Sequence, residues 1–143
     1  IESAKLIAFV PALRQKAIFK SLVNAEEILP FCDLTICHGG SGTVYQSLMA
    51  NTPVLCFPHN PDQGLVAMAV KDGNFGNAIS PAQVNSNSIL QSIRDLMNDQ
   101  EKTRSVRTFS EKLNSHDTKN LWLSFLSQIT SASADHHVLE EII

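Results

Sequence analysis

The stretch that decides the fold reads Leu34-Thr35-Ile36-Cys37-His38-Gly39-Gly40-Ser41-Gly42-Thr43. Its apolar start predicts a strand, its glycines predict a turn, and the residues from about Thr43 to Ala50 predict a helix. Glycines lack a Cβ atom, so the backbone of such a turn can take positive φ and approach a ligand closely. The turn and the first helical turn then offer unpaired N–H groups at the positive end of the helix dipole. We expect an anion there, above all a phosphate group.

His38 stands at the predicted end of this strand, where its imidazole can donate a further hydrogen bond to the anion. Taken alone, the glycine-rich turn could equally be a tight connection between a strand and a helix, with His38 as a structural histidine. The choice between these interpretations depends on the residues that follow.

Length and composition indicate one ordinary globular domain, because the chain has 143 residues and 43% of them are hydrophobic. A net charge of -3 provides no basic field for nucleic acid or anionic lipid, so the turn itself would hold a phosphate group. No apolar run approaches the roughly 20 residues of a membrane span. We therefore expect a cytoplasmic protein that has no transmembrane segment and binds no nucleic acid.

The cysteines Cys32, Cys37 and Cys56 are odd in number and have neither zinc-site nor redox-pair spacing, so we expect reduced core thiols. His136 and His137 form a pair without a nearby thiolate, and we expect no metal site there. The chain begins without methionine directly before a strand-like segment, which suggests a piece of a longer protein. We expect residues 132–143 to form a flexible tail.

Strands and helices are predicted to alternate along the chain. Strands are predicted at 5–10, 33–37, 53–58 and 77–80, with a weaker candidate at 17–23. Helices are predicted at about 24–29, 43–51, 62–71, 86–97, 100–113 and 118–129. This alternation predicts an α/β fold with a Rossmann-like parallel sheet and helices on both faces. Ligands bind beyond the carboxyl ends of such strands, so the turn at His38 and the loop 59–63 should lie side by side.

Helix ends are predicted from cap residues. Asn24 is expected to cap the helix at 24–29, and Asp62 with Gln63 could cap the helix that follows them. Gly73 and Gly76 are expected to close that helix.

Three motifs follow one another in a specific order: Cys37-His38-Gly39-Gly40-Ser41-Gly42-Thr43, Asn51-Thr52-Pro53-Val54-Leu55-Cys56-Phe57-Pro58 and Pro61-Asp62-Gln63-Gly64. Their order and spacing resemble the donor-binding domain of nucleotide-sugar glycosyltransferases. The most similar family includes bacterial antibiotic and sterol glucosyltransferases, UDP-glucuronosyltransferases and plant flavonoid glycosyltransferases. The resemblance covers about residues 22–76 and implies the carboxyl-terminal half of a two-domain GT-B fold, with 1–131 as a partial donor domain.

The resemblance also implies roles for individual residues. The diphosphate of a UDP- or dTDP-sugar would be held by His38, Gly39, Gly40, Ser41, Gly42 and Thr43. Asp62 and Gln63 would contact hydroxyls of the transferred sugar, Gln46 the ribose, and the backbone of Leu22 and Val23 the nucleobase. The N–H donors would stabilise the charge that builds on the leaving diphosphate, as a metal ion does in other transferases. We therefore expect neither a metal ion nor a cofactor, since the nucleotide-sugar is a substrate.

Three features depart from the family pattern, and one of them is Asn24-Ala25, which stands where the family has Pro-Gln. Gln46 replaces a glutamate, which removes a charge-assisted hydrogen bond to the ribose, and Leu22 replaces an aromatic ring that stacks on the base in the plant branch. In the family, a histidine of the amino-terminal domain is the general base. We expect the donor-binding part of an inverting hexosyltransferase, with no catalytic residue of its own and inactive alone. A small-molecule or lipid acceptor would bind through the other domain.

Other functions stay open at this point. A non-catalytic nucleotide-sugar binding or regulatory domain of the same fold would fit Gln46 and the missing aromatic ring. Esterases also use His-Gly-Gly in their oxyanion holes, but the chain has no Gly-x-Ser-x-Gly nucleophile elbow. An epimerase or a cell-wall lipid glycosyltransferase would share the fold, and the pair Asp62-Gln63 argues against both. Gln46 could be a solvated helix residue, and His59 an exposed loop residue.

Overall fold

The computed structural model describes residues 18, 20–115, 120 and 122–128. Within them lies a three-stranded parallel sheet of order β1-β2-β3. The strands are β1 (Thr35–Cys37), β2 (Val54–Cys56) and β3 (Gly76–Ala78). The helices are α2 (Ala25–Ile28), α3 (Ser41–Met49), α4 (Pro61–Asp72), α5 (Ser86–Asn98) and α6 (Gln100–Asn114), with 3-10 turns at Leu29–Phe31 and Pro81–Gln83. The predicted α/β fold with a parallel sheet is confirmed.

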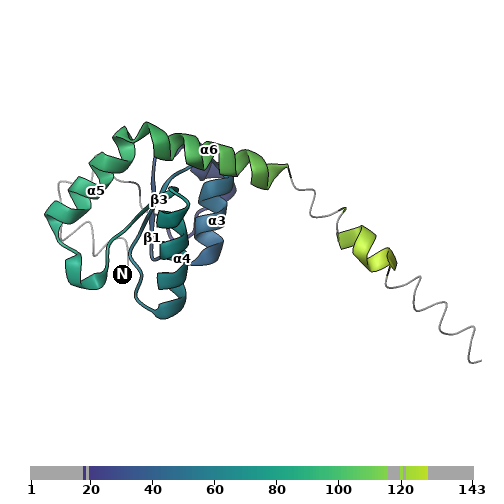
Figure 1. Ribbon diagram of the computed structural model, residues 1–143, viewed down its shortest axis with the longest axis horizontal. Helices are drawn as coiled ribbons and strands as arrows, with labels where there is room; N and C mark the ends of the chain where they lie inside the picture. The colour runs from purple at the N-terminus through teal and green to yellow at the C-terminus, as the bar shows by residue number, and fades with distance from the viewer. Residues whose placement is uncertain (1–17, 19, 116–119, 121, 129–143) are drawn as a thin grey trace, which may run out of the picture.

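Helices cover both faces of the sheet, because successive side chains of the central strand β2 point to opposite faces. Val54 and Cys56 are buried in a cluster with side chains from α3, α4 and α6. Leu55 is buried on the other face with Ile79 and with Leu96 of α5. Figure 1 shows α3 and α4 on one side of the sheet and α5 on the other, while α6 runs across the end of α3.

The end of α3 that lies away from the glycine turn is fixed by α6. The carbonyl oxygen of Met49 accepts a hydrogen bond of 2.8 Å from Ser110 Oγ and one of 3.0 Å from Asn114 Nδ2. Both donors lie on α6 and satisfy a carbonyl group that the last turn of α3 cannot pair internally. This contact holds α3 at its carboxyl end, while its amino end stays at the edge of the sheet where β1 ends.

Most predicted helices and strands are present, with differences at their ends. Asn24 caps α2 as expected, and Gly73 ends α4. The residue that caps α4 is Asn60 and not Asp62, because Asn60 has extended backbone and its side chain accepts from the N–H of Gln63. Gly76 does not end that helix either, because it is the first residue of β3.

The predictions near the two ends of the chain have different outcomes, because the structure describes only some of those residues. The strand predicted at 5–10 and the tail predicted at 132–143 lie outside the described residues. Residues 18 and 20–23 are described and are not in a strand, so the weaker strand candidate is wrong there. Residues 120 and 122–128 are helical, in agreement with the last predicted helix. Over the described stretches, the structure has no helix with the length and apolar character that crossing a membrane requires.

Candidate functional site

The turn between β1 and α3 places the imidazole of His38 against the backbone of Gly40. Gly39 has a φ of 87°, a left-handed conformation that favours glycine. Gly40 has extended backbone instead, with φ of -65° and ψ of 133°. An ideal Cβ atom on Gly40 would lie only 2.6 Å from Nε2 of His38. Glycine is therefore required at position 39 because the backbone there is left-handed. It is required at position 40 because the imidazole of His38 occupies the place of a Cβ atom.

Helix α3 begins at Ser41 without a side-chain cap. Its first backbone hydrogen bond, of 3.1 Å, runs from the N–H of Val44 to the carbonyl of Gly40. The N–H groups of Ser41, Gly42 and Thr43 precede that bond and have no partner within the helix.

Helices α2, α4, α5 and α6 begin differently. Each of α2, α4, α5 and α6 starts with an asparagine or aspartate whose side chain accepts from the first turn: Asn24, Asn60, Asn85 and Asp99. A capped amino terminus has fewer N–H groups to offer an external ligand. The start of α3, where Gly40 has no side chain to cap it, suits an external anion best.

The start of α4 lies against the glycine turn, which confirms the expectation that the two loops are neighbours. An ideal Cβ atom on Gly39 would lie 3.1 Å from the carbonyl oxygen of Gln63. The N–H of His59 donates to Oε1 of Gln63 at 2.8 Å, and the N–H of Gln63 donates to Oδ1 of Asn60 at 2.9 Å. These bonds fix the first turn of α4, on which Asp62 is exposed.

The remaining predicted site residues are on the surface. Gln46 is exposed on α3, in the turn after Thr43. Leu22 is 89% exposed and Val23 is 45% exposed, just before α2, which packs against α3. The structure thus brings the residues from His38 to Thr43 together with Gln63. The contacts predicted for Gln46 with the ribose and for Val23 with the nucleobase stay predictions.

Two of the cysteines predicted to be reduced core thiols lie next to the glycine turn, and both are free, with Cys56 buried and Cys37 partly exposed. Cys37 at the end of β1 is the register partner of Cys56 at the end of β2. A hydrogen bond with the Cys56 thiol, helped by the N–H of Gly39 and the nearby His38, lowers the pKa of Cys37 to about 6. The same hydrogen bond, together with burial, raises the pKa of Cys56. Their positions at or near the ends of the successive predicted strands 33–37 and 53–58 were the signal that could have revealed the pair.

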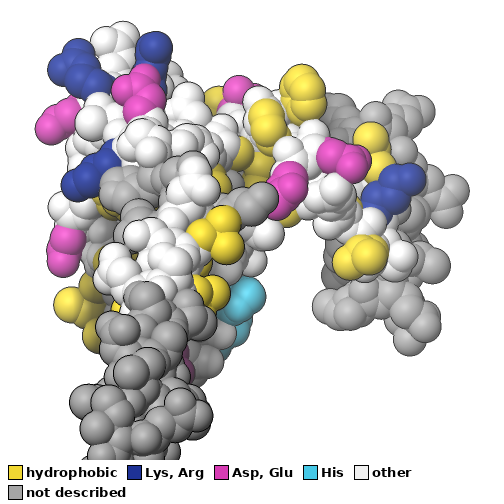
Figure 2. Space-filling model, turned by 90° about the vertical axis from the view of Figure 1, so that its right-hand side faces the viewer, with side chains coloured by type: hydrophobic (Ala, Val, Ile, Leu, Met, Phe, Trp, Pro, Cys, Tyr) yellow, Lys and Arg dark blue, Asp and Glu magenta, His cyan; other side chains and the backbone are white. Residues whose placement is uncertain are grey.

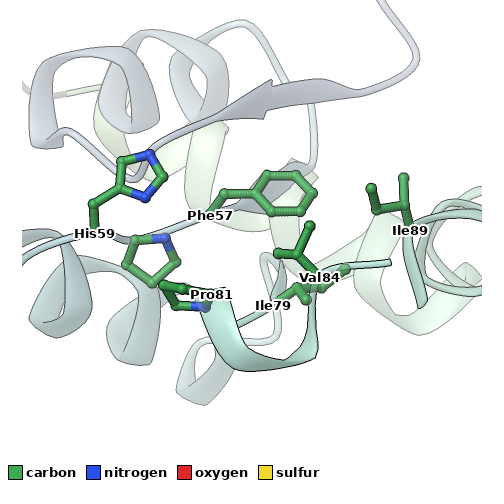
Figure 3. A pocket seen from close by; sticks show the side chains of 7 residues that line it. Phe57, His59, Ile79, Pro81, Val84 and Ile89 are labelled. Atoms are coloured by element: carbon green, nitrogen blue, oxygen red, sulfur yellow. The ribbon is translucent and has the colours of Figure 1, made fainter. Parts of the chain in front are cut away.

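An apolar pocket of about 450 Å³ opens beside the loop that follows β2. Its lining comes from that loop, from the segment after β3 and from α5, and consists of Phe57, Pro58, His59, Ile79, Pro81, Val84 and Ile89. Figure 3 shows the imidazole of His59 at one end of this row and Ile89 at the other. His59 therefore belongs to the rim of an apolar pocket as well as to the hydrogen bonds that hold Gln63.

The chain as a whole offers an anion little long-range attraction, because its net charge is -3. On the face that Figure 2 shows, lysine and arginine side chains lie beside aspartate and glutamate side chains. Opposite charges at such short range largely cancel at a distance, so a bound phosphate would depend on the N–H groups of the turn. No cluster of three or more His, Cys, Asp or Glu side chains suited to a metal ion occurs in the described part of the chain.

A parallel sheet whose glycine turn leads into an uncapped helix defines a Rossmann-like domain with an anion site at the carboxyl ends of its strands. Residues 6–119 match the family described as erythromycin biosynthesis protein CIII-like, C-terminal domain. The chain belongs to this family. The resemblance to the carboxyl-terminal domain of glycosyltransferases is thereby confirmed.

Two curated relatives are about a quarter identical to the chain over the part that aligns. The uncharacterized UDP-glucosyltransferase YdhE of Bacillus subtilis is 26% identical over 85 residues, which are 59% of this chain and 22% of the relative. The demethyllactenocin mycarosyltransferase of Streptomyces fradiae is 23% identical over 77 residues, which are 54% of this chain and 17% of the relative. The chain thus spans only about a fifth of the length of these relatives.

Solved structures agree in fold. The glycosyltransferase VinC, crystallised in complex with dTDP, superposes with a TM-score of 0.72 at 19% identity, covering 79% of this chain and 29% of that one. The spinosyn forosaminyltransferase SpnP superposes with a TM-score of 0.71 at 16% identity, covering 81% of this chain and 32% of that one. At these identities the likeness shows the fold, which is that of one domain of a GT-B glycosyltransferase.

Proposed function

We propose that the chain is the donor-binding part of an inverting glycosyltransferase that transfers a hexosyl group from a UDP- or dTDP-sugar to an acceptor hydroxyl. The observation that carries this proposal is the uncapped start of α3 behind Gly39, in contact with Gln63 at the start of α4. Family membership supports it, as do a relative named as a UDP-glucosyltransferase and a related fold solved with dTDP.

The diphosphate would lie at the start of α3. The N–H groups of Ser41, Gly42 and Thr43 and the helix dipole would face the oxygens on which negative charge grows as the bond between sugar and oxygen breaks. His38, whose ring lies against Gly40, would add a side-chain donor. Fixed donors of this kind do the work of a divalent cation, so we propose that binding needs neither metal nor cofactor.

The transferred sugar would lie at the start of α4. Asp62 is exposed there and offers two carboxylate oxygens to sugar hydroxyls. Oε1 of Gln63 already accepts from His59, so a sugar hydroxyl would receive a hydrogen bond from Nε2 of Gln63. Such a carboxylate–amide pair would discriminate sugars by the positions of their hydroxyls.

The acceptor, a small molecule or a lipid, and the general base would come from the rest of the full-length protein. The chain alone would bind the donor and transfer nothing. Gln46, which stands where the family has glutamate, favours a second candidate, a non-catalytic nucleotide-sugar binding domain of the same fold. The predicted cytoplasmic location stays a prediction.

Calorimetric titration tests the proposal directly. The chain is titrated with UDP, dTDP and GDP and with their sugars, each with and without magnesium. We expect UDP or dTDP to bind with the same affinity in both buffers, even at millimolar strength. If neither binds to the full-length protein, the donor-site proposal is wrong; if both bind there without transfer to any acceptor, the non-catalytic candidate is favoured.

Gln46→Glu is expected to tighten UDP binding about fivefold if this side chain meets the ribose. A carboxylate accepts a stronger, charge-assisted hydrogen bond than an amide, and the gain of about 1 kcal/mol corresponds to that factor. Gln100→Glu on α6 is the matched control, because it adds the same charge on another exposed position. Equal affinities of the two variants would place Gln46 outside the site.

A further inference from the structure

Cys37 and Cys56 lie side by side on neighbouring strands, at the backbone spacing that a disulfide requires. The two residues are register partners on neighbouring parallel strands. Both side chains belong to the same cluster between the sheet and helices α3, α4 and α6. Neighbouring strands lie about 4.8 Å apart, within the roughly 4.4–6.8 Å between Cα atoms that a disulfide spans. The two sulfur atoms can therefore be joined without separating the strands.

The two thiols differ in reactivity. Cys56 is 0% exposed, whereas Cys37 is partly exposed. The hydrogen bond between them lowers the pKa of Cys37 to about 6 and raises the pKa of Cys56. Cys37 is therefore the sulfur that a small oxidant can reach, and its contact with Cys56 favours the thiolate form of Cys37 and the protonated form of Cys56. A reactive cysteine next to a resolving cysteine is the arrangement of redox-sensitive sites.

We propose that hydrogen peroxide converts Cys37 and Cys56 into a disulfide that ties the end of β1 to the end of β2. The Cys37 thiolate attacks one peroxide oxygen, which breaks the O–O bond, forms a sulfenic acid and releases hydroxide that leaves as water after protonation. The Cys56 sulfur then attacks the Cys37 sulfur. The thiol proton and the sulfenic hydroxyl leave together as a second water, and the peroxide is the two-electron oxidant.

The disulfide alters the turn that we assign to the diphosphate, a consequence that rests on the proposed function. The N–H of Gly39 donates to Sγ of Cys37 at 3.4 Å. An ideal Cβ atom on Gly39 would lie 3.7 Å from Cβ of Cys56. A disulfide sulfur is drawn toward Cys56 and is a poorer acceptor than a thiolate, so the turn loses this bond. We expect UDP or dTDP binding to weaken about tenfold.

The cross-link is tested in a Cys32→Ser variant, which keeps only Cys37 and Cys56 of the three cysteines. The variant is treated with peroxide and cleaved with cyanogen bromide after Met49, which lies between them in sequence. We expect the two flanking fragments to stay joined within one chain until a reductant is added. A Cys32→Ser/Cys56→Ser control should give separate fragments. Separate fragments from the test variant, with sulfinic acid on Cys37, or a link between two chains, would overturn the proposal.

A second measurement separates this proposal from the proposed function. UDP and dTDP are titrated into the reduced and the oxidised Cys32→Ser chain. A disulfide with unchanged affinity overturns the link to binding and leaves the cross-link in place. Absence of binding to the reduced full-length protein overturns the donor-site proposal, while the fragment assay still decides whether the disulfide forms.

Discussion

Gly40→Ala is expected to weaken binding of UDP or dTDP about a hundredfold while the fold stays intact. The added Cβ atom would lie 2.6 Å from Nε2 of His38, so the imidazole has to leave its place against the turn. The ring is exposed and can move, so unfolding free energy changes little. A hydrogen bond to a charged group contributes about 1.5–3 kcal/mol, and losing the one from His38 accounts for most of the effect. Calorimetric titration measures the loss of UDP or dTDP affinity, and urea unfolding checks that the variant is folded.

Two further variants show whether Gly40→Ala loses affinity because it displaces His38. His38→Ala should lose affinity by a similar factor, and the double variant should lose little more than either single variant, because both remove the same contact. Gly64→Ala is the matched control, since an added Cβ atom there would also meet nothing within 4 Å and Gly64 lies outside the phosphate turn. It should keep most of the affinity. A folded Gly40→Ala chain that binds as tightly as the parent would refute the phosphate assignment.

The strand, glycine turn and helix around Gly39 could be predicted from sequence because local residues determine them. An apolar run ending in glycines has few alternatives, and the positive φ of Gly39 follows from its lack of a side chain. The start of α4 was harder, because Asn60 and Asp62 are both good caps. Proline at the first helical position pre-sets the helical φ, so Pro61 favoured Asn60, and the structure has that arrangement.

Long-range neighbours explain what the sequence did not reveal. The pairing of Cys37 with Cys56 depends on the register of two strands whose ends were predicted only approximately. The row of apolar side chains beside His59 depends on how α5 packs against the sheet. The predicted roles of Gln46 and Val23 are contacts with a bound nucleotide. The position of that nucleotide follows neither from composition nor from local structure.

Gly76 is the clearest case of a residue whose role comes from tertiary structure. Sequence analysis interpreted it as the end of a helix, whereas it is the first residue of β3 and the partner of Val54 in β2. A Cβ atom there would collide with the carbonyl oxygen of Val54 and lie 2.8 and 3.0 Å from its carbonyl carbon and nitrogen. All of these are backbone atoms of a fully buried strand. They cannot avoid the added Cβ atom by a change of rotamer, as a side chain could.

Gly76→Ala is therefore expected to lower the free energy of unfolding by about 3 kcal/mol or more, the upper range for an overfilled core. Relief requires β3 to move away from β2, which breaks the hydrogen bond of 3.2 Å from the N–H of Val54 to the carbonyl of Phe75. Urea unfolding of both proteins measures the change. Gly64→Ala is the control, because an added Cβ atom in α4 would meet nothing within 4 Å and alanine favours a helix by about 1 kcal/mol. Equal stability of Gly76→Ala and the parent chain would contradict the close pairing of β2 with β3, and with it the sheet that holds both loops of the site together.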